Sequence, residues 1–228
     1  MMLARKGATL FDCTEQPHQL VAVGSVLHMA REGATIWGTG VHGSVQDIGH
    51  RYRMLDVRAT RGPVTRQFLQ KRGIPAPEIY GDPGLLVPML TGDRFQVTGE
   101  FEVGFVPNFH DLKHLNTKKF QQRFPDITII NPLRAWNLVI PDILKCKYIL
   151  ASSLHGIIIA EAFGIPARYL RLTEHEALLK YEDYFEGTGR RVSFASSVEH
   201  ALDIGGLTLG AYDSAPLVAA FPYDLWGL

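Results

Sequence analysis

The sequence predicts an α/β fold with two lobes, each built on a parallel sheet. Short apolar runs with the length of buried strands alternate with longer helical segments from Leu20 onward. This alternation is typical of parallel β–α–β units, so each lobe is expected to be Rossmann-like. A polar stretch at residues 91–100 (TGDRFQVTGE), with a glycine near either end, interrupts the pattern. We therefore expect an N-terminal lobe at residues 1–92 and a C-terminal lobe at residues 100–228.

The N-terminal lobe begins after a weakly patterned lead-in. Residues 1–19 carry charges, Pro17 and little periodicity. Apolar runs predict strands at residues 20–25, 34–40, 54–60 and 78–83. Residues 26–30 predict a short helix, and residues 62–73 predict an amphipathic helix with a proline in its first turn and a glycine at its end. The first two strands run into glycines, which suggests a ligand-binding edge.

The C-terminal lobe repeats the alternation. Apolar runs predict strands at residues 101–109, 127–133, 148–153 and 167–172. Helical segments are predicted near residues 111–123, 138–146, 155–164, 197–205 and 215–221. A tyrosine-rich segment, KYEDYFEGTGR, occupies residues 180–190, and the sequence closes with FPYDLWGL. The aromatic residues of this tail predict that the last helix packs back onto the body of the protein.

The composition is that of an ordinary globular protein. Of the 228 residues, 46% are hydrophobic, and 23 Lys and Arg balance 23 Asp and Glu. Without a basic surplus, nucleic acid is not an expected partner. Cys13 and Cys146 lie far apart with no CxxC pair, which argues against a disulfide framework and fits a reducing cytoplasm. No signal peptide or run of about 20 apolar residues is visible, so we expect a cytoplasmic chain without a spanning helix.

A glycine pattern after the second predicted strand has the spacing of a dinucleotide-binding fingerprint. Gly38, Gly40 and Gly43 fit G-x-G-x-x-G, but the residues that follow, SVQDIGHRYR, lack the apolar spacing of a helix that packs on a sheet. A pyrophosphate needs the N-terminus of that helix, so no nucleotide cofactor is expected. No metal site is expected either, because the spacing of metal ligands is missing from His28, His42, His50 and His114.

Residues 148–167 (YILASSLHGIIIAEAFGIPA) carry the strongest functional signal. An apolar strand ends in two serines, and an almost wholly apolar helix starts at once. Ser152 or Ser153 caps the first turn, whose free N–H groups carry partial positive charge, and His155 is the one titratable side chain beside them. The turn therefore suits an anion such as phosphate or carboxylate. The alternative is that the serine is only a helix cap.

A second functional signal follows the third predicted strand. Arg58 and Arg61 lie where that strand ends and the next helix begins, the usual place for a ligand contact in an open α/β sheet. A guanidinium group binds phosphate or carboxylate through two hydrogen bonds, and we favour this role for Arg61. The alternative is a solvated pair of arginines. Asp82, before Pro83, is either a general acid–base or a carboxylate that stabilises a turn.

Two further sets of polar residues lie in the C-terminal lobe. Asn108, His110 and Asp111 follow its first strand, and His110 is either a proton-transfer group near neutral pH or a solvated loop histidine. Glu161 lies on the apolar helix about 600° round from His155, and therefore on a different face. A buried carboxylate needs a partner, so Glu161 either pairs across the lobe interface or binds hydroxyl groups of a ligand.

Several motifs together resemble the polysaccharide pyruvyl transferase family. In chain order they are LVAVGSVLHMA with TIWGTG, DVRATRGPVTRQFL with EIYGDPGLL, and YILASSLHGIIIAEAFGIPA. The segments KYEDYFEGTGR and FPYDLW look like the branch that includes the xanthan ketal pyruvate transferase. The resemblance implies a two-lobed fold similar to GT-B glycosyltransferases. It also implies phosphoenolpyruvate as the donor, used as a co-substrate without a cofactor, and a lipid-linked sugar repeat of an exopolysaccharide as the acceptor.

The resemblance also implies roles for individual residues. Forming a ketal requires protonation of the methylene carbon, attack by two sugar hydroxyls and loss of phosphate. His155 is the expected general acid or phosphate ligand, Arg61 the expected anion clamp, and His110 a further catalytic candidate. Donor-binding candidates are Ser152, Ser153, Leu154, Gly156, Arg58 and Asn108. Candidates on the acceptor side are Gly24, Ser25, Gly38, Gly40, Asp82 and Glu161. A lipid-linked acceptor implies peripheral association with the inner face of the membrane.

The sequence departs from the family pattern in three places. Many members begin with a further strand and a loop bearing glycine and aspartate, so an incomplete N-terminal lobe is a further expectation. Many members also carry Arg in place of Ser153, and a histidine is expected in place of Asn108. Two other functions stay open. One is a GT-B-like glycosyltransferase that uses a nucleotide sugar, and the other is a truncated, non-catalytic module that binds a sugar.

Overall fold

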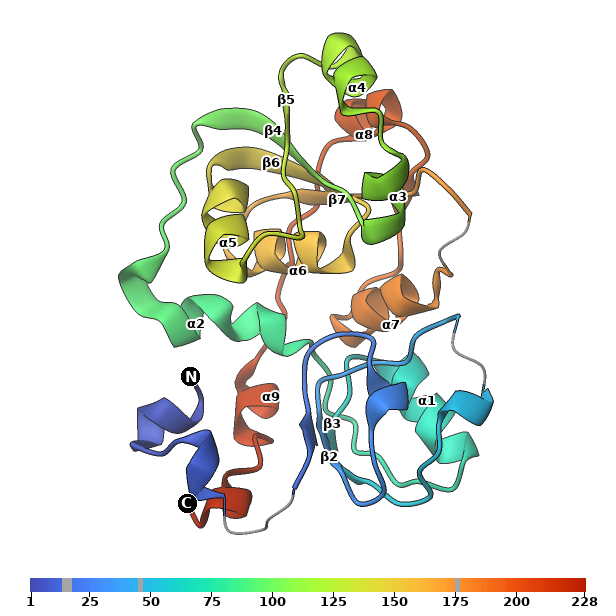
Figure 1. Ribbon diagram of the computed structural model, residues 1–228, viewed down its shortest axis with the longest axis vertical. Coiled ribbons are helices and arrows are strands. Elements are labelled where there is room, and N and C mark those ends of the chain that lie inside the picture. Colours follow the sequence, from blue (N-terminus) through green and yellow to red (C-terminus); the bar gives the residue numbers. More distant parts are fainter. Residues whose placement is uncertain (14–17, 45–46, 175–176) are drawn as a thin grey trace. The chain divides into compact units, whose positions relative to one another are not determined.

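The protein is described by a computed structural model that covers residues 1–13, 18–44, 47–174 and 177–228 (Figure 1). The chain forms two compact units. The first unit comprises Met1–Leu86, Glu176–Val192 and Tyr212–Leu228, and the second comprises Val87–His175 and Ser193–Ala211. This division differs from the expected lobes, because the tyrosine-rich segment and the tail join the first unit. Pro17 of the predicted lead-in lies outside the described residues.

The first unit contains a parallel sheet in the order β1-β2-β3. Its strands β1 (Leu20–Val21), β2 (Thr35–Trp37) and β3 (Asp56–Ala59) fall within three of the predicted runs. The predicted helix after β3 is confirmed as α1 (Pro63–Lys71), which has its proline at the first helical position. The short helix predicted after β1 is a single 3₁₀ turn, Leu27–Met29. The glycine pattern after β2 leads to another 3₁₀ turn, Asp47–Gly49.

The prediction of a fourth strand in the first unit, at residues 78–83, is wrong. These residues form only an isolated parallel bridge, between Thr60 and Tyr80. Gly81 then turns the chain away with a φ of 145°, and Pro83 opens a 3₁₀ turn, Pro83–Leu86. Proline has no N–H to donate to a ladder, so the run cannot continue as a paired strand.

Two late segments of the chain complete the first unit. They carry α7 (Leu179–Gly187) and α9 (Ala215–Ala219). The indole N–H of Trp37 in β2 donates to the carbonyl of Leu217 at 2.8 Å, and its ring meets Phe221 edge-on at 4.9 Å. Such a buried indole contributes apolar area and one satisfied hydrogen bond at once. The tail is therefore part of the core beside β2.

The second unit contains a parallel sheet in the order β5-β4-β6-β7-β8. Its strands are β4 (Phe101–Val106), β5 (Ile127–Ile129), β6 (Cys146–Ala151), β7 (Ala167–Leu170) and β8 (Phe194–Ala195). The sequence predicts the first four, and the two-residue β8 is too short to give a pattern. Phe105, Leu150, Leu170 and Ala195 are fully buried on four of these strands and share one core cluster. The predicted α/β class with two parallel sheets is thus confirmed.

Helices cover both faces of the second sheet (Figure 1). The helices of this unit are α2 (Val87–Thr91), α3 (Phe109–His114), α4 (Thr117–Arg123), α5 (Trp136–Leu144), α6 (Leu154–Ala162) and α8 (Val198–Ile204). Helices α5 and α6 pack on one face, and α4 and α8 lie together on the other. The single helix predicted near residues 111–123 is split, because the Asn116 side chain accepts the Lys119 N–H and starts a new helix. No helix in the described residues has the length and apolar character needed to cross a membrane.

The strand order of the second unit creates a topological switch point. The chain moves from β4 to β5 on one side, and from β6 through β7 to β8 on the other. The connections that leave β4 and β6 therefore diverge where these two strands end. In open α/β sheets a ligand binds in the crevice that forms there, outside the carboxyl ends of the strands. The residues after Val106 and Ala151 occupy this position.

Candidate functional site

The ends of β4 and β6 are tied together by hydrogen bonds. The N–H groups of Ser152 and Ser153 both donate to the carbonyl of Val106, at 3.1 and 3.2 Å. In return, the Asn108 N–H donates to Ser152 Oγ at 3.0 Å, and its side-chain amide donates to the Ser152 carbonyl at 3.3 Å. Ser152 is 1% exposed. Asn108 and Ser152 therefore fix the two strand ends to each other, which keeps the turn after β6 in place.

This turn presents the start of α6. Ser153 is the N-cap, and its Oγ accepts the Gly156 N–H at 3.4 Å. Leu154 is buried, while Ser153 and His155 are half-buried. The first N–H groups of a helix have no partner within the helix, and the helix dipole adds partial positive charge there. The predicted set of Ser152, Ser153 and His155 is thus brought together at an edge suited to an anion.

Gly156 allows α6 to approach the strand ends closely. A Cβ at this position would lie 2.8 Å from Val106 Cβ and 3.0 Å from Ala151 Cβ. Real Cβ atoms do not come so near, so any side chain here pushes the helix start away from β4 and β6.

We expect Gly156→Ala to destabilise the second unit by about 1–3 kcal/mol, because overpacking forces the helix or the strands to shift. Urea denaturation followed by circular dichroism measures this loss. The matched controls are Val106→Ala and the double variant, which remove Val106 Cγ1, 2.9 Å from the new Cβ, and keep Val106 Cβ. The double variant should lose less stability than the sum of the two single losses. Losses that simply add would contradict the steric explanation.

The second unit also holds the candidates His110 and Glu161. His110 is exposed on α3, with its ring 4.6 Å from that of His114. Glu161 is 3% exposed and lies six residues after His155, about 9 Å along the α6 axis at 1.5 Å per residue. Glu161 is thus placed near the opposite end of the helix from the candidate site.

Arg61 lies in the core of the first unit. It is fully buried, and its Nε donates to Asp183 Oδ2 at 3.0 Å. Its Nη1 donates to Ser25 Oγ at 2.6 Å and its Nη2 to the Val41 carbonyl at 3.2 Å. Gly40 makes room for the guanidinium, since a Cβ there would lie 2.3 Å from Arg61 Cζ. The arginine expected as an anion clamp is therefore engaged by the protein itself.

Asp183 completes this buried pair and was not predicted as a site residue. Its carboxylate also accepts the Thr65 N–H at 2.8 Å and the Thr65 hydroxyl at 2.7 Å, at the start of α1. Gly62 and Gly187 let α7 approach this point, since a Cβ on Gly62 would lie 1.7 Å from the Asp183 carbonyl oxygen. The sequence offers one signal for it, an acidic residue inside an aromatic helix.

The remaining candidates of the first unit also have partners within it. Arg58 binds Asp56 and Asp224, with its Nη2 2.6 Å from Asp224 Oδ2. The hydrogen bond from Arg58 lowers the pKa of the Asp224 carboxyl. Asp82 is fully buried and accepts the Gly84 N–H at 2.9 Å, as a turn carboxylate does. Gly24 accepts the Thr39 hydroxyl through its carbonyl at 2.7 Å.

Gly38 meets a backbone requirement of the first unit. It has a φ of 86°, and a Cβ there would lie 2.4 Å from Pro83 Cδ. Only glycine adopts this conformation without strain and leaves room for the proline ring. Its place in the G-x-G-x-x-G spacing thus has a local explanation.

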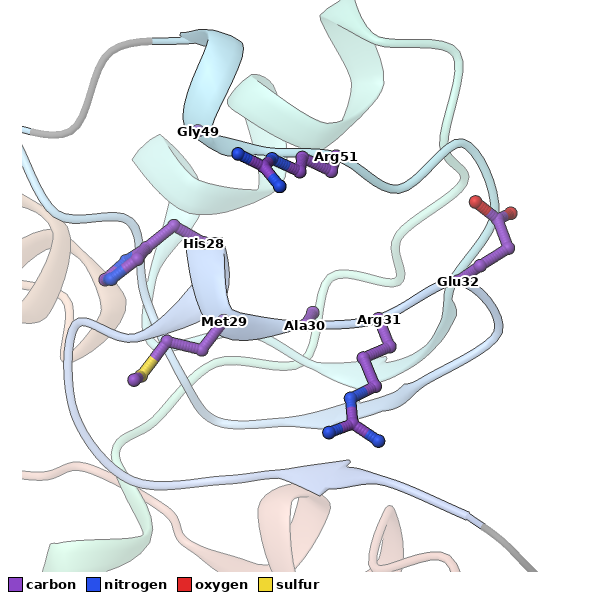
Figure 2. A pocket seen from close by; sticks show the side chains of 7 residues that line it. All are labelled: His28, Met29, Ala30, Arg31, Glu32, Gly49 and Arg51. Atoms are coloured by element: carbon purple, nitrogen blue, oxygen red, sulfur yellow. The ribbon is translucent and has the colours of Figure 1, made fainter.

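A surface hollow of about 400 Å³ also lies in the first unit (Figure 2). Its lining includes His28, Arg31, Glu32 and Arg51, and it shares no residue with the predicted site. Glu32 already accepts the N–H groups of Arg53 and Met54 at 2.8 and 2.7 Å. Figure 2 shows the side chains of Arg31 and Arg51 pointing in different directions, so the two guanidinium groups do not converge on one ligand position.

Comparison with known proteins decides the family. The family model of the polysaccharide pyruvyl transferases matches residues 19–172, about two thirds of the chain. The chain belongs to the polysaccharide pyruvyl transferase family. The matched residues include all of β1 to β3 and β4 to β7, and therefore the switch point. Asp183 and the tail lie beyond the match in this pyruvyl transferase family member.

A curated relative is also similar to this member of the family. It is the uncharacterized protein L143 of Acanthamoeba polyphaga mimivirus, 27% identical over 177 residues. The alignment covers 73% of this chain and 59% of the viral protein. The chain thus spans less than two thirds of the length of the relative that it matches.

Arg171 is a further candidate site residue of this pyruvyl transferase family member, and the sequence did not predict it. It follows β7, two residues beyond the pair Ala151 and Tyr169, and so stands level with Ser153 on the neighbouring strand. Its guanidinium lies 5.4 Å from the Phe194 ring centre, and its buried Nε has no hydrogen-bond partner among the described residues. The available signal was an arginine directly after an apolar strand. It is a cation at the same sheet edge as the α6 N-terminus.

Proposed function

We propose that the protein transfers pyruvate from phosphoenolpyruvate to a sugar and forms a ketal with two of its hydroxyls. Membership of the polysaccharide pyruvyl transferase family supports a transferase with a polysaccharide-type acceptor. The observation that carries the donor assignment is the start of α6 at the switch point, held by Asn108 and Ser152. This edge suits a ligand that bears both a phosphate and a carboxylate.

The chemistry defines what the site must do. The methylene carbon of the donor gains a proton, two sugar hydroxyls bond to the neighbouring carbon and lose their protons, and the carbon–oxygen bond to phosphate breaks. In the balanced reaction, one hydroxyl proton is matched by the new methyl hydrogen and the other by hydrogen phosphate. We assign the phosphate to the α6 N–H groups and Arg171, and proton delivery to His155.

The acceptor assignment extends the proposal. The acceptor is a lipid-linked repeat of an exopolysaccharide, as in the xanthan-like branch that KYEDYFEGTGR and FPYDLW resemble. Such an acceptor places the protein in the cytoplasm at the inner face of the membrane, by peripheral association. In the first unit, Arg61 acts by positioning Ser25 and the backbone at Val41.

Binding of phosphoenolpyruvate to the purified chain, measured by calorimetry, tests the donor assignment. Arg171→Ala is expected to weaken binding by about 1.5–3 kcal/mol, the contribution of a charge-assisted hydrogen bond. The matched control is Arg123→Ala, an exposed arginine of the same unit that pairs with exposed Glu199. It should leave the affinity unchanged within about 0.5 kcal/mol.

The alternatives are outcomes of the same measurement. Binding of a uridine diphosphate sugar in place of phosphoenolpyruvate would support a nucleotide-sugar glycosyltransferase. A folded chain that binds neither would support the non-catalytic module.

A further inference from the structure

Asp111 is a buried carboxylate in the second unit that the assigned chemistry does not use. It lies in the first turn of α3 and is 6% exposed. Its Oδ1 is buried and has no hydrogen-bond partner among residues 1–13, 18–44, 47–174 and 177–228. Buried carboxylates are normally paired or hydrogen-bonded, because an unsatisfied one destabilises the fold. A group kept in this state therefore points to a partner outside the protein.

The position of Asp111 connects it to the candidate donor site. Its own N–H donates to Asn108 Oδ1 at 2.7 Å. The same Asn108 binds Ser152 through its backbone N–H and its side-chain amide. Asn108 therefore links the turn that carries Asp111 to the turn that starts α6. Both turns follow adjacent parallel strands at the carboxyl edge of the sheet.

The charge of Asp111 excludes a direct contact with an anionic donor. A carboxylate beside a phosphate or a second carboxylate is repelled, so it would weaken donor binding. A sugar hydroxyl has the complementary chemistry, because its O–H donates a hydrogen bond to the free carboxylate oxygen. A carboxylate that accepts this bond is also placed to act as a general base.

We propose that Asp111 binds a hydroxyl of the acceptor sugar and removes its proton as that oxygen attacks the donor. This inference rests on the proposed function. The hydroxyl oxygen forms a bond to the carbon that carries the phosphate, and its proton moves to Asp111 Oδ1. The electron pair of the donor double bond takes up a proton at the methylene carbon. When phosphate leaves and the second hydroxyl closes the ketal, the proton of that hydroxyl returns to His155, which protonated the methylene carbon, and the proton on Asp111 passes to the departing phosphate.

The rate test uses Asp111→Asn and a matched carboxylate of the same unit. The control is Asp126→Asn, an exposed aspartate just before β5, at the opposite edge of the sheet. Phosphate release is measured with phosphoenolpyruvate and methyl β-D-galactopyranoside, a simple sugar with free hydroxyls. Asp111→Asn should slow release by about 100-fold, as expected for loss of a general base, and Asp126→Asn should not change it. An unchanged rate in Asp111→Asn would overturn the proposal.

Two further measurements need no turnover and therefore apply whichever sugar is accepted. Asp111→Asn should bind phosphoenolpyruvate as tightly as the wild type or up to about fivefold more tightly, because a negative charge near the donor is removed. Its thermal midpoint should stay within about 2 °C of the wild type or rise, because an unsatisfied buried charge is lost. A midpoint lowered by more than this, with weaker donor binding, would identify Asp111 as a structural residue instead.

The outcomes separate this inference from the proposed function. Wild-type protein that does not bind phosphoenolpyruvate contradicts the donor assignment, whatever Asp111→Asn does. Wild-type protein that binds it, together with an Asp111→Asn variant that keeps full turnover or loses stability, contradicts only the role of Asp111.

Discussion

Replacing Arg61 or Asp183 by alanine is expected to lower the free energy of unfolding by about 3–5 kcal/mol. Both side chains are 0% exposed, and they are joined by a 3.0 Å ion pair. Removing either partner leaves the other as an uncompensated buried charge, which is strongly destabilising. Urea denaturation of each variant measures the effect. Arg51→Ala, an exposed arginine of the same unit, should change stability by less than about 0.5 kcal/mol.

A double variant distinguishes the ion pair from general packing. Arg61→Met with Asp183→Leu removes both charges and keeps apolar volume, so it should be more stable than either alanine variant. Equal losses in all three would show that lost hydrogen bonds, and not an uncompensated charge, set the loss of stability. A loss of donor binding in Arg61→Ala that occurs without a loss of stability would return Arg61 to the role of anion clamp.

Replacing His155 by alanine is expected to slow phosphate release by about 100- to 10,000-fold, the usual contribution of a general acid. His155 is half-buried in the first turn of α6, beside the Ser153 cap. It is thus the proton-transfer group closest in sequence to the proposed phosphate position. Release from phosphoenolpyruvate with methyl β-D-galactopyranoside gives the rate, and calorimetry gives the donor affinity.

The variant His155→Gln separates the two roles considered for this residue. Glutamine keeps a hydrogen-bond donor but does not deliver a proton at neutral pH. If His155 is the general acid, glutamine and alanine lose the rate alike, while donor affinity stays near that of the wild type. If His155 is only a phosphate ligand, glutamine retains much of the affinity and the rate. Full activity in both variants would exclude either role.

Most of the fold was predictable because its elements are local patterns. The seven strands β1 to β7 are apolar runs between turn residues, and α1 and α6 have clear start and stop signals. The run at residues 78–83 was misread because its apolar content resembles a strand, while Pro83 and the φ of Gly81 end the pairing. The grouping of α7 and α9 with the first unit depends on contacts between segments distant in the sequence, which no local pattern encodes.

Only the part of the candidate site at the start of α6 was predictable from the sequence. Ser153 and His155 are adjacent in sequence, so a strand that turns into a helix places them together without further information. Arg61 has the sequence position of a ligand contact, but its partner Asp183 lies 122 residues away, and no local pattern links the two residues. Arg171 was missed for the same reason, and Asp111 was noted only for its place after the first strand of the C-terminal lobe. Their interest comes from buried atoms left without a partner in the described residues, a property of packing.

The repeated passage of the chain between its two units affects the order in which they are completed during synthesis. The first unit contains Tyr212–Leu228, and the second contains β8 near residue 194. Trp37 therefore lacks the Leu217 carbonyl until the segment around residue 217 has left the ribosome. The second unit can close its sheet earlier, while the first still exposes the apolar surface beside β2. Newly made chains should therefore depend on chaperones mainly through their first unit.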